Sequence, residues 1–214
     1  MNIGFNLKLR IASAGLAVAL VSGGCAMMAP KAERYVAPPL GSTWVRAQRD
    51  SGSYGSRSVQ LQFKRGERIW QGQQVITFEN PQWAILAEPT TGSFLGIVSG
   101  NRPVMTWDPP TGFDFPLMVG KTWTKSYRVT IHARNQTIPF EQTQKVEAYE
   151  DVTVPAGTFK AFKISSFNTL GNEDVYWYSP DLGIFVKQIL TRTSKNAAGP
   201  GVEETEVVSQ TIKK

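Results

Sequence analysis

The stretch Tyr127-Arg-Val-Thr-Ile-His-Ala-Arg134 alternates apolar residues with polar or charged ones. Successive side chains of a β-strand point to opposite faces of the sheet, so this period of two is typical of a half-buried strand. It places four apolar side chains on a face that packs against a core: Tyr127, Val129, Ile131 and Ala133. The other face, which includes His132, is expected to meet water. We therefore predict a strand over Thr122–Arg134.

Similar short runs, rich in β-branched and aromatic residues, fill the chain from Gly41 to the C-terminus, and Gly, Pro and Asn interrupt them. Two of the expected strands are Ile138–Tyr149 and Glu150–Val154, and only Val59–Arg68 also fits a short helix. The connections are too short for the helical crossovers that parallel strands need. The sequence predicts a single all-β domain over residues 41–214, folded as an antiparallel meandering barrel, half-barrel or sandwich.

Two motifs in the C-terminal half contain the proline and glycine of tight turns. Asp151–Lys163 reads DVTVPAGTFKAFK, and Tyr176–Lys187 reads YWYSPDLGIFVK. Proline ends strand pairing and glycine accepts a positive φ, so each motif fits a hairpin between two strands. Upstream of both, Pro116–Trp123 reads PLMVGKTW. These residues are expected to define turns of the fold.

Together the motifs resemble an uncharacterised family of β-rich bacterial envelope proteins, which carries V-P-A-G-x-F-x-A followed by W-Y-x-P-x-x-G-x-V-K. The likeness covers about residues 115–190. The chain departs from each pattern by one residue, with Thr158 before Phe159 and Phe185 before Val186. Because the activity of the family is uncharacterised, the resemblance implies a β-rich envelope domain and transfers no catalytic residues.

The N-terminus has the charge and hydropathy pattern of a signal peptide. Met1–Arg10 carries two basic residues and no acid, and the small and apolar run Ile11–Val21 follows. This run is shorter than the roughly 20 residues that a membrane-spanning helix needs. Two cleavage sites are possible, one after Ala19 and one before Cys25. The second lies in Val21-Ser-Gly-Gly-Cys25, which resembles the lipobox of bacterial lipoproteins except at Ser22, where an aliphatic residue is usual.

Cleavage after Ala19 would leave an apolar core of only Ile11–Leu16, so the sequence favours residues 1–24 as the signal peptide and a lipid on Cys25. Cys25 is the only cysteine, so it has no partner for a disulfide within the chain. By resemblance to bacterial lipoproteins, it would carry two or three acyl chains such as palmitate, which anchor stably where one does not. Ala26, in place of an aspartate, implies the periplasmic face of the outer membrane. The proline-rich segment Cys25–Leu40 is expected to form an extended tether, with a reach of roughly 45 Å.

The charge of the chain excludes one class of partner. The leader holds two of the 23 basic residues and none of the 17 acidic ones, which leaves a net charge of +4 after cleavage. The basic residues are scattered along the alternating segments, whereas nucleic-acid binders cluster them. We expect a membrane partner through Cys25, a possible envelope-protein, lipid or wall-polymer partner, and no nucleic acid.

The sequence contains little that could perform catalysis. His132 is the only histidine, and no nucleophile motif accompanies it, so we expect no enzyme activity, no cofactor and no nitrogen- or sulfur-rich metal site. The best polar candidates are Asp108 and Asp114, which flank a Pro-Pro turn and could converge on a hard cation or act as paired carboxylates. Ordinary turn chemistry also explains them. Trp107 and Phe113 beside them are the leading candidates for exposed aromatic contacts with a ligand.

Three functions remain open. The first is a non-catalytic binding or structural role for a membrane-anchored envelope lipoprotein. The second is a carrier or chaperone of a lipid or acyl chain, which requires an apolar cavity. The third, hydrolysis of a wall polymer, requires two carboxylates roughly 5 to 10 Å apart in a cleft.

Overall fold

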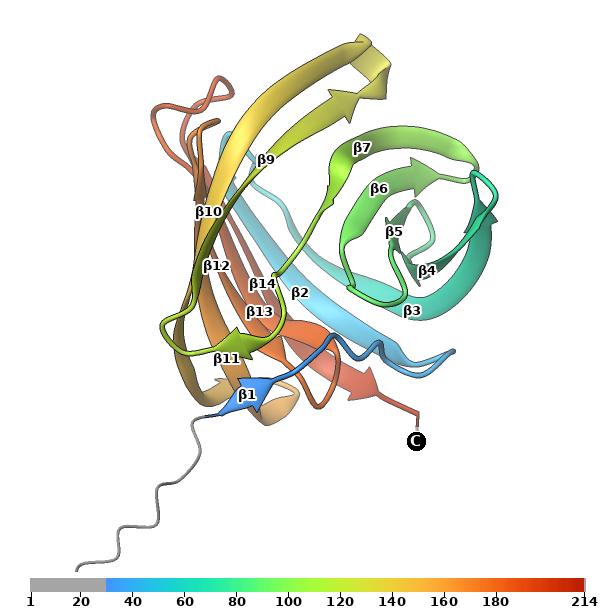
Figure 1. Cartoon of the computed structure of the whole chain (residues 1–214), viewed down its shortest axis with the longest axis vertical. Helices are drawn as coiled ribbons and strands as arrows, with labels where there is room; N and C mark the ends of the chain where they lie inside the picture. The colour runs from blue at the N-terminus through green and yellow to red at the C-terminus, as the bar shows by residue number, and fades with distance from the viewer. Residues whose placement is uncertain (1–29, 214) are drawn as a thin grey trace, which may run out of the picture.

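The computed structural model describes residues 30–213, which are built almost wholly of antiparallel β-strands (Figure 1). The predicted signal peptide and Cys25 lie outside the described residues. Twelve strands close into a barrel in the order β10-β11-β12-β13-β14-β2-β3-β4-β5-β6-β7-β9, which confirms the all-β antiparallel barrel expected from the sequence. Within residues 30–213, no helix is long and apolar enough to cross a membrane.

The strands follow one another with short turns, as hairpin connections allow. They are β1 Lys31–Ala32, β2 Thr43–Gly52, β3 Ser58–Trp70, β4 Gln73–Glu79, β5 Ala84–Ala87, β6 Phe94–Ser99, β7 Arg102–Thr111, β8 Leu117–Met118, β9 Thr122–Ile131, β10 Gln136–Val154, β11 Gly157–Asn168, β12 Asn172–Ser179, β13 Ile184–Arg192 and β14 Gly201–Thr211. The 3₁₀ helix η1, His132–Arg134, joins β9 to β10.

The barrel wall is tall on one side and strongly curled on the other. Strands β9 to β14 and β2 form the tall side, while β3 to β7 curl beside them (Figure 1). The seam between the two parts, β7 with β9, pairs only Met105–Asp108 with Arg128–Ile131. The short pair β1–β8 is a separate two-stranded sheet that packs against the barrel, at the end where the described chain begins (Figure 1).

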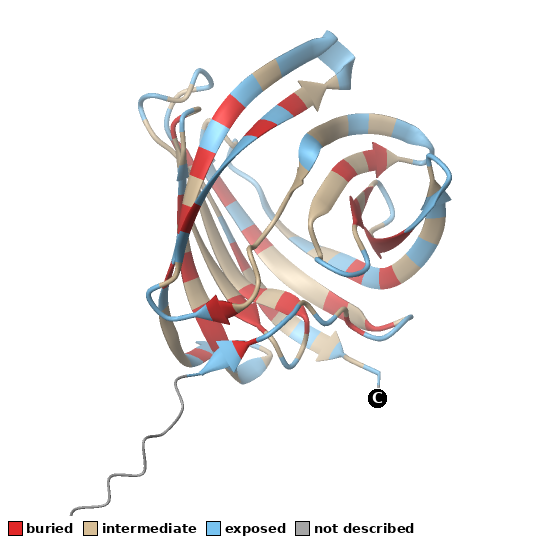
Figure 2. Cartoon of the chain, in the orientation of Figure 1, coloured by how far each residue is buried: buried red, intermediate tan, exposed pale blue. Residues whose placement is uncertain are grey.

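Buried residues lie inside the curl of β4 to β6, along the tall wall and at its lower end (Figure 2). Val146, Phe162 and Ile164 are among the most buried side chains there. Trp44 stacks on Phe63, with ring centroids 5.9 Å apart, and helps to join the wall to the curled part. Such aromatic pairs give large apolar burial and fixed geometry.

Three local expectations change. β10 is one strand of 19 residues, where the sequence suggested two, because a bulge between Val146 and Ala148 lets the ladder continue past the break in alternation. β9 ends at Ile131, so His132 lies in η1 instead of a strand; Asn135 then reverses the chain in the left-handed conformation, φ 46°. Val59–Arg68, the possible helix, belongs to β3.

The proline-rich segment also differs from the extended tether that its composition suggests. From Lys31 onward it packs against the barrel: Ala32 is buried, and the Tyr35 ring lies 6.2 Å from Phe115 and 6.4 Å from Tyr178 between centroids. Strand pairing of β1 with β8 and burial of the Tyr35 ring offset the conformational entropy that this segment loses when it is ordered. The proline content alone does not reveal these contacts.

Candidate functional site at the β7–β9 fork

The seam between β7 and β9 opens into a fork. β9 pairs with β10 over its whole length, but with β7 only over Arg128–Ile131. Below that point β7 leaves β9, and within the described residues the edge Thr122–Tyr127 has no strand beside it on the β7 side. No backbone hydrogen bond outside the strand ladders of residues 30–213 involves this edge either. Unpaired N–H and C=O groups on such an edge are a template for another chain.

A hollow of about 530 Å³ lies at the fork. It is lined by Asp108, Pro109, Ser126, Tyr127, Arg128, Pro139 and Phe140. Arg128 donates to Asp108, and because both side chains are largely exposed, 62% and 71%, this ion pair stabilises the fold by only ~0–1 kcal/mol. Tyr127 is buried, and burial raises the pKa of its hydroxyl. The site therefore combines an apolar floor with a charged rim.

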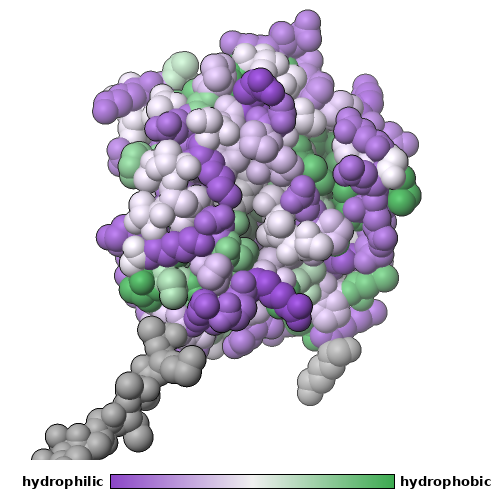
Figure 3. Space-filling view, in the orientation of Figure 1, coloured by the Kyte–Doolittle hydropathy of each residue, from purple (hydrophilic) through white to green (hydrophobic). Residues whose placement is uncertain are grey.

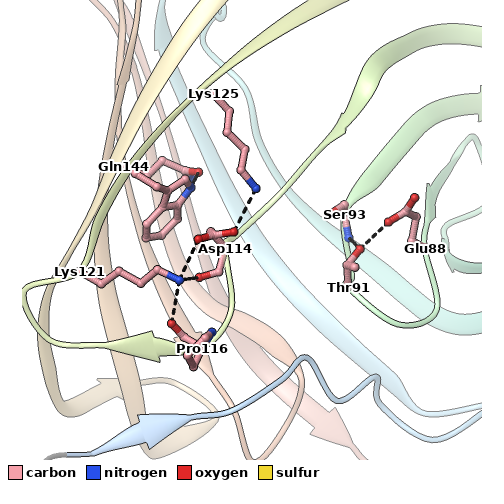
Figure 4. A network of polar contacts seen from close by, with 9 residues as sticks. Glu88, Thr91, Ser93, Asp114, Pro116, Lys121, Lys125 and Gln144 are labelled. Carbon is pink, nitrogen blue, oxygen red and sulfur yellow. Dashed lines mark hydrogen bonds and ion pairs between the residues drawn. The ribbon is translucent and has the colours of Figure 1, made fainter.

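Residues 112–116, called the strap below, run from β7 across the barrel to β8 (Figure 4). Asp114 in the strap accepts from Lys121 Nζ at 2.9 Å and from Lys125 Nζ at 3.1 Å. The hydrogen bond from Lys121 is the main reason that the pKa of Asp114 lies below its usual range. Lys121 also donates to the Pro116 carbonyl at 3.1 Å. Asp114 thus fixes the strap to the start of β9.

Phe113 holds the strap from the inside. Its ring meets four others edge-on, at centroid distances of 6.3, 5.9, 6.0 and 5.5 Å, from Trp123, Tyr176, Tyr178 and Phe185. The sequence suggested Phe113 as a surface contact with a ligand; the ring is half-buried, because alternation stops at the strap and neighbouring residues no longer show which way the ring points. These rings belong to one cluster beneath the strap, in which Trp123 and Tyr178 are buried.

Trp107 also points toward the interior. It is half-buried and packs with Tyr127, Val129 and Phe140. In the seam, it lies opposite Val129 of β9. Trp107 therefore stays a candidate for a ligand contact only through its exposed part, since one strand register places it on the core face while its neighbour Asp108 faces the fork.

The two aspartates do not share a site. Asp108 pairs with Arg128, whereas Asp114 pairs with Lys121 and Lys125. Each carboxylate is already neutralised by its own cations, which disfavours both a shared metal and a shared proton. Within residues 30–213, no three His, Cys, Asp or Glu side chains gather as a metal site would require.

His132 is exposed at the upper end of β9. Its Nε2 lies 3.0 Å from Thr106 Oγ1, and this contact is its one side-chain hydrogen bond within the described residues. No carboxylate orients the imidazole there, as a catalytic triad would need. The position fits a role in closing the β9–β10 turn.

Sequence reasoning missed a polar network inside the barrel. Gln48 Nε2 donates to Asp50 at 2.8 Å and to Glu203 at 3.0 Å, and Arg46 donates to the Gln188 side chain at 2.8 Å. Burial lowers the pKa of Arg46 to about 10. Burial also raises the pKa of Glu203, and the nearby Asp50 adds to this shift. The alternation of β2 does show a polar face, but only the closure of the barrel turns that face inward.

No protein-family model matches the chain, and no curated protein matches it. Among solved structures, the fold is similar to that of a Parabacteroides distasonis protein described as a lipoprotein, with 12% identity and a TM-score of 0.43 over 84% of this chain and 99% of that one. It is also similar to an exported protein with YmcC-like fold from Bacteroides fragilis, with 13% identity, a TM-score of 0.43 and the same coverage. The hypothetical lipoprotein YmcC from Escherichia coli has 11% identity and a TM-score of 0.44, over 81% of this chain and 89% of that one.

Proposed function

We propose that this chain is a lipid-anchored envelope protein that acts by binding: its β7–β9 fork receives an extended segment of a partner protein. The observation that carries the proposal is the unpaired edge Thr122–Tyr127 beside a hollow of about 530 Å³. An added strand gains backbone hydrogen bonds along an edge, and side-chain pockets beside the edge select its sequence. No catalytic step is needed.

The chemistry of the fork indicates what the segment would carry. Pro109, Pro139 and Phe140 offer an apolar surface, which suits one large apolar side chain. Asp108 and Arg128 at the rim suit polar or charged neighbours, and rim charges mainly set the rate and specificity of association. The partner is thus an extended, amphipathic peptide segment.

Two other functions have less support. A carrier of acyl chains needs an apolar cavity, but Phe113, Tyr178 and Phe185 occupy the barrel interior beneath the strap. A hydrolase acting through Asp108 and Asp114 needs both carboxylates at one cleft, and each is held by separate cations.

The proposed location is the periplasmic face of the outer membrane, and it rests on the leader sequence. Ile11–Val21 precedes Val21-Ser-Gly-Gly-Cys25, and Ala26 follows the cysteine. Mass spectrometry of the protein purified from membranes of its own host tests this directly. Acyl chains on Cys25 are expected, whereas an unmodified N-terminus at Leu20 would rule out the anchor.

Site-specific photocrosslinking in that host tests the fork. A photoreactive amino acid at Ser126, which lines the hollow, is expected to capture one partner through a short extended segment. The matched control position is Glu204, which is exposed on β14. A synthetic peptide of the captured segment should compete and should slow hydrogen exchange at Trp123–Tyr127. Equal capture at both positions, or a peptide that leaves these amides unprotected, contradicts the proposal.

A further inference from the structure

We infer that the barrel end formed by residues 30–42 and the β8 turn lies directly on the bilayer that holds the lipid of Cys25. This rests on the proposed lipid anchor and adds an orientation and a contact surface. The end is called the β1–β8 end below. The surface that this end contacts is the lipid bilayer itself. Four observations support this contact: exposed apolar side chains, rigid attachment, unpaired basic groups and a short covalent link.

Exposed apolar residues concentrate at this end. Residues 30–213 contain seven large hydrophobic side chains that are classed as exposed. Four belong to the β1–β8 end: Val36 at 54%, Leu40 at 57%, Met118 at 39% and Val119 at 47%. The other three, Ile69, Val104 and Phe167, lie on three different strands elsewhere. Figure 3 shows hydrophobic surface at the lower edge of the molecule, next to the point where the grey N-terminal residues leave.

These side chains sit on a rigid support. Lys31 pairs with Met118 in the β1–β8 ladder, so both apolar segments are joined. Gly183, with φ +68°, lies so close to the Val36 carbonyl that an added Cβ would clash with its oxygen. Beyond Val36 the chain continues across the end toward β2 (Figure 1). An apolar surface held in place in this way loses little conformational freedom when it enters an interface.

The charges around the apolar residues suit a membrane surface. Glu33 is paired with Lys31 at 2.9 Å, whereas Arg34 and Lys213 have no ion pair within the described residues. Lys213 belongs to the same end, since its backbone N–H donates to Ser42 Oγ at 3.0 Å. Basic side chains beside an apolar surface favour anionic headgroups, which adds to hydrophobic insertion.

The covalent link leaves little distance between this end and the anchor. Cys25 precedes Pro30 by five positions in the sequence. A chain spans at most roughly 3.5 Å per residue, so the link can cover at most about 18 Å. Pro30 directly precedes β1, which pairs with β8, and the lipid therefore brings this end to the headgroups before any other. β9 starts at the same end and extends away from it, so the fork would open sideways and remain accessible to a partner.

Spin labelling of the lipidated full chain in vesicles tests the contact. A cysteine is introduced by Val119→Cys, and Ile69→Cys, at a residue that is 68% exposed, is the matched control. In vesicles of phosphatidylethanolamine and phosphatidylglycerol, we expect the label at 119 to contact dissolved oxygen and to be shielded severalfold from a water-soluble nickel chelate. The label at 69 should remain fully accessible to the chelate.

Intact mass measured on the same samples separates the two proposals. If the protein bears lipid but the chelate reaches the labels at 119 and 69 equally, the docked orientation is wrong and the proposed lipid anchor is unaffected. Protein from its own host that lacks acyl chains overturns the anchor and the orientation together. A further variant has Val36, Leu40, Met118 and Val119 all changed to Ser and carries its spin label at Arg34→Cys. In lipidated protein, these four changes should restore access of the chelate to the label at 34. Unchanged shielding of that label counts against contact through these side chains.

Discussion

Replacing Asp174 with Asn should make the protein more stable at neutral pH. Asp174 is buried inside the barrel, where the Thr191 N–H donates to Oδ1 at 3.0 Å and the Tyr176 hydroxyl donates to Oδ2 at 3.2 Å. No cation pairs with it within residues 30–213. Burial raises the pKa of this carboxyl to about 6, although both hydrogen bonds oppose the rise. An amide keeps the acceptor for Thr191 and can donate to the Tyr176 oxygen, so the variant removes the charge and retains the contacts.

The sign follows from the two protonation states. The folded protein holds the proton of Asp174 more tightly than the unfolded chain does, whose aspartates have a pKa of about 3.9. Above pH 6, folding therefore includes the cost of a buried charge; between pH 6 and pH 4 that cost disappears as the carboxyl is protonated. A shift of about 2 pKa units corresponds to about 3 kcal/mol. We expect Asp174→Asn to raise the free energy of unfolding by about 2–3 kcal/mol at pH 7.5 and by less than ~0.5 kcal/mol at pH 4.

Urea unfolding followed by tryptophan fluorescence, at intervals between pH 4 and pH 8, measures the difference between the variant and the parent. Asp108→Asn is the matched control, because the Asp108 side chain is 71% exposed and the same chemical change there removes no buried charge. A difference for Asp174→Asn that stays constant from pH 4 to pH 8, or that grows toward acid, would refute the reasoning.

Three further predictions concern the strap and the fork. Phe113→Ala removes a half-buried ring with four aromatic contacts and should lower the free energy of unfolding by about 2–4 kcal/mol in urea titrations, whereas Phe167→Ala, at a ring that is 57% exposed, should change it by less than ~1 kcal/mol. Asp114→Asn should cost about 1 kcal/mol at pH 7; because the pKa of Asp114 is lowered in the folded state, this loss should vanish in the same titrations as pH falls through that pKa. Arg128→Ala should leave the thermal midpoint within a few degrees of the parent, while photocrosslinking from Ser126 should fall severalfold if the rim contributes to partner binding.

The sequence was informative wherever a local period determines structure. The alternation Tyr127-Arg-Val-Thr-Ile predicted the core face of β9, and Tyr127 and Val129 are indeed buried. His132 is exposed as predicted, but the predicted strand ends before it, at Ile131, because the end of a strand depends on how its partner turns back, and here Asn135 makes that turn. Boundaries of this kind depend on tertiary pairing, which a period of two does not contain.

The candidate site could be predicted less well, since it consists of non-local relations. The sequence singled out Trp107–Pro116, and that segment does supply both the fork and the strap. It could not show that Asp108 and Asp114 meet different cations, because Arg128, Lys121 and Lys125 reach them only through the register of β7 against β9 and the path of the strap. The polar network inside the barrel could not be predicted for the same reason. The sequence pattern of a polar strand face is the same whether the barrel encloses that face or water covers it.

Asp114 connects the two surfaces for which we propose contacts. Lys121 lies at the turn that follows Met118 and Val119 at the β1–β8 end, and Lys125 lies on the unpaired edge of β9 beside the fork. One carboxylate holds both lysines, at 2.9 and 3.1 Å (Figure 4). The strap is therefore fixed from the β8 turn to the unpaired edge of β9, and Phe113 anchors it to the interior between them. Loosening this one contact should disturb the edge and the turn together, which neither the Arg128 pair nor the Tyr35 contacts would do.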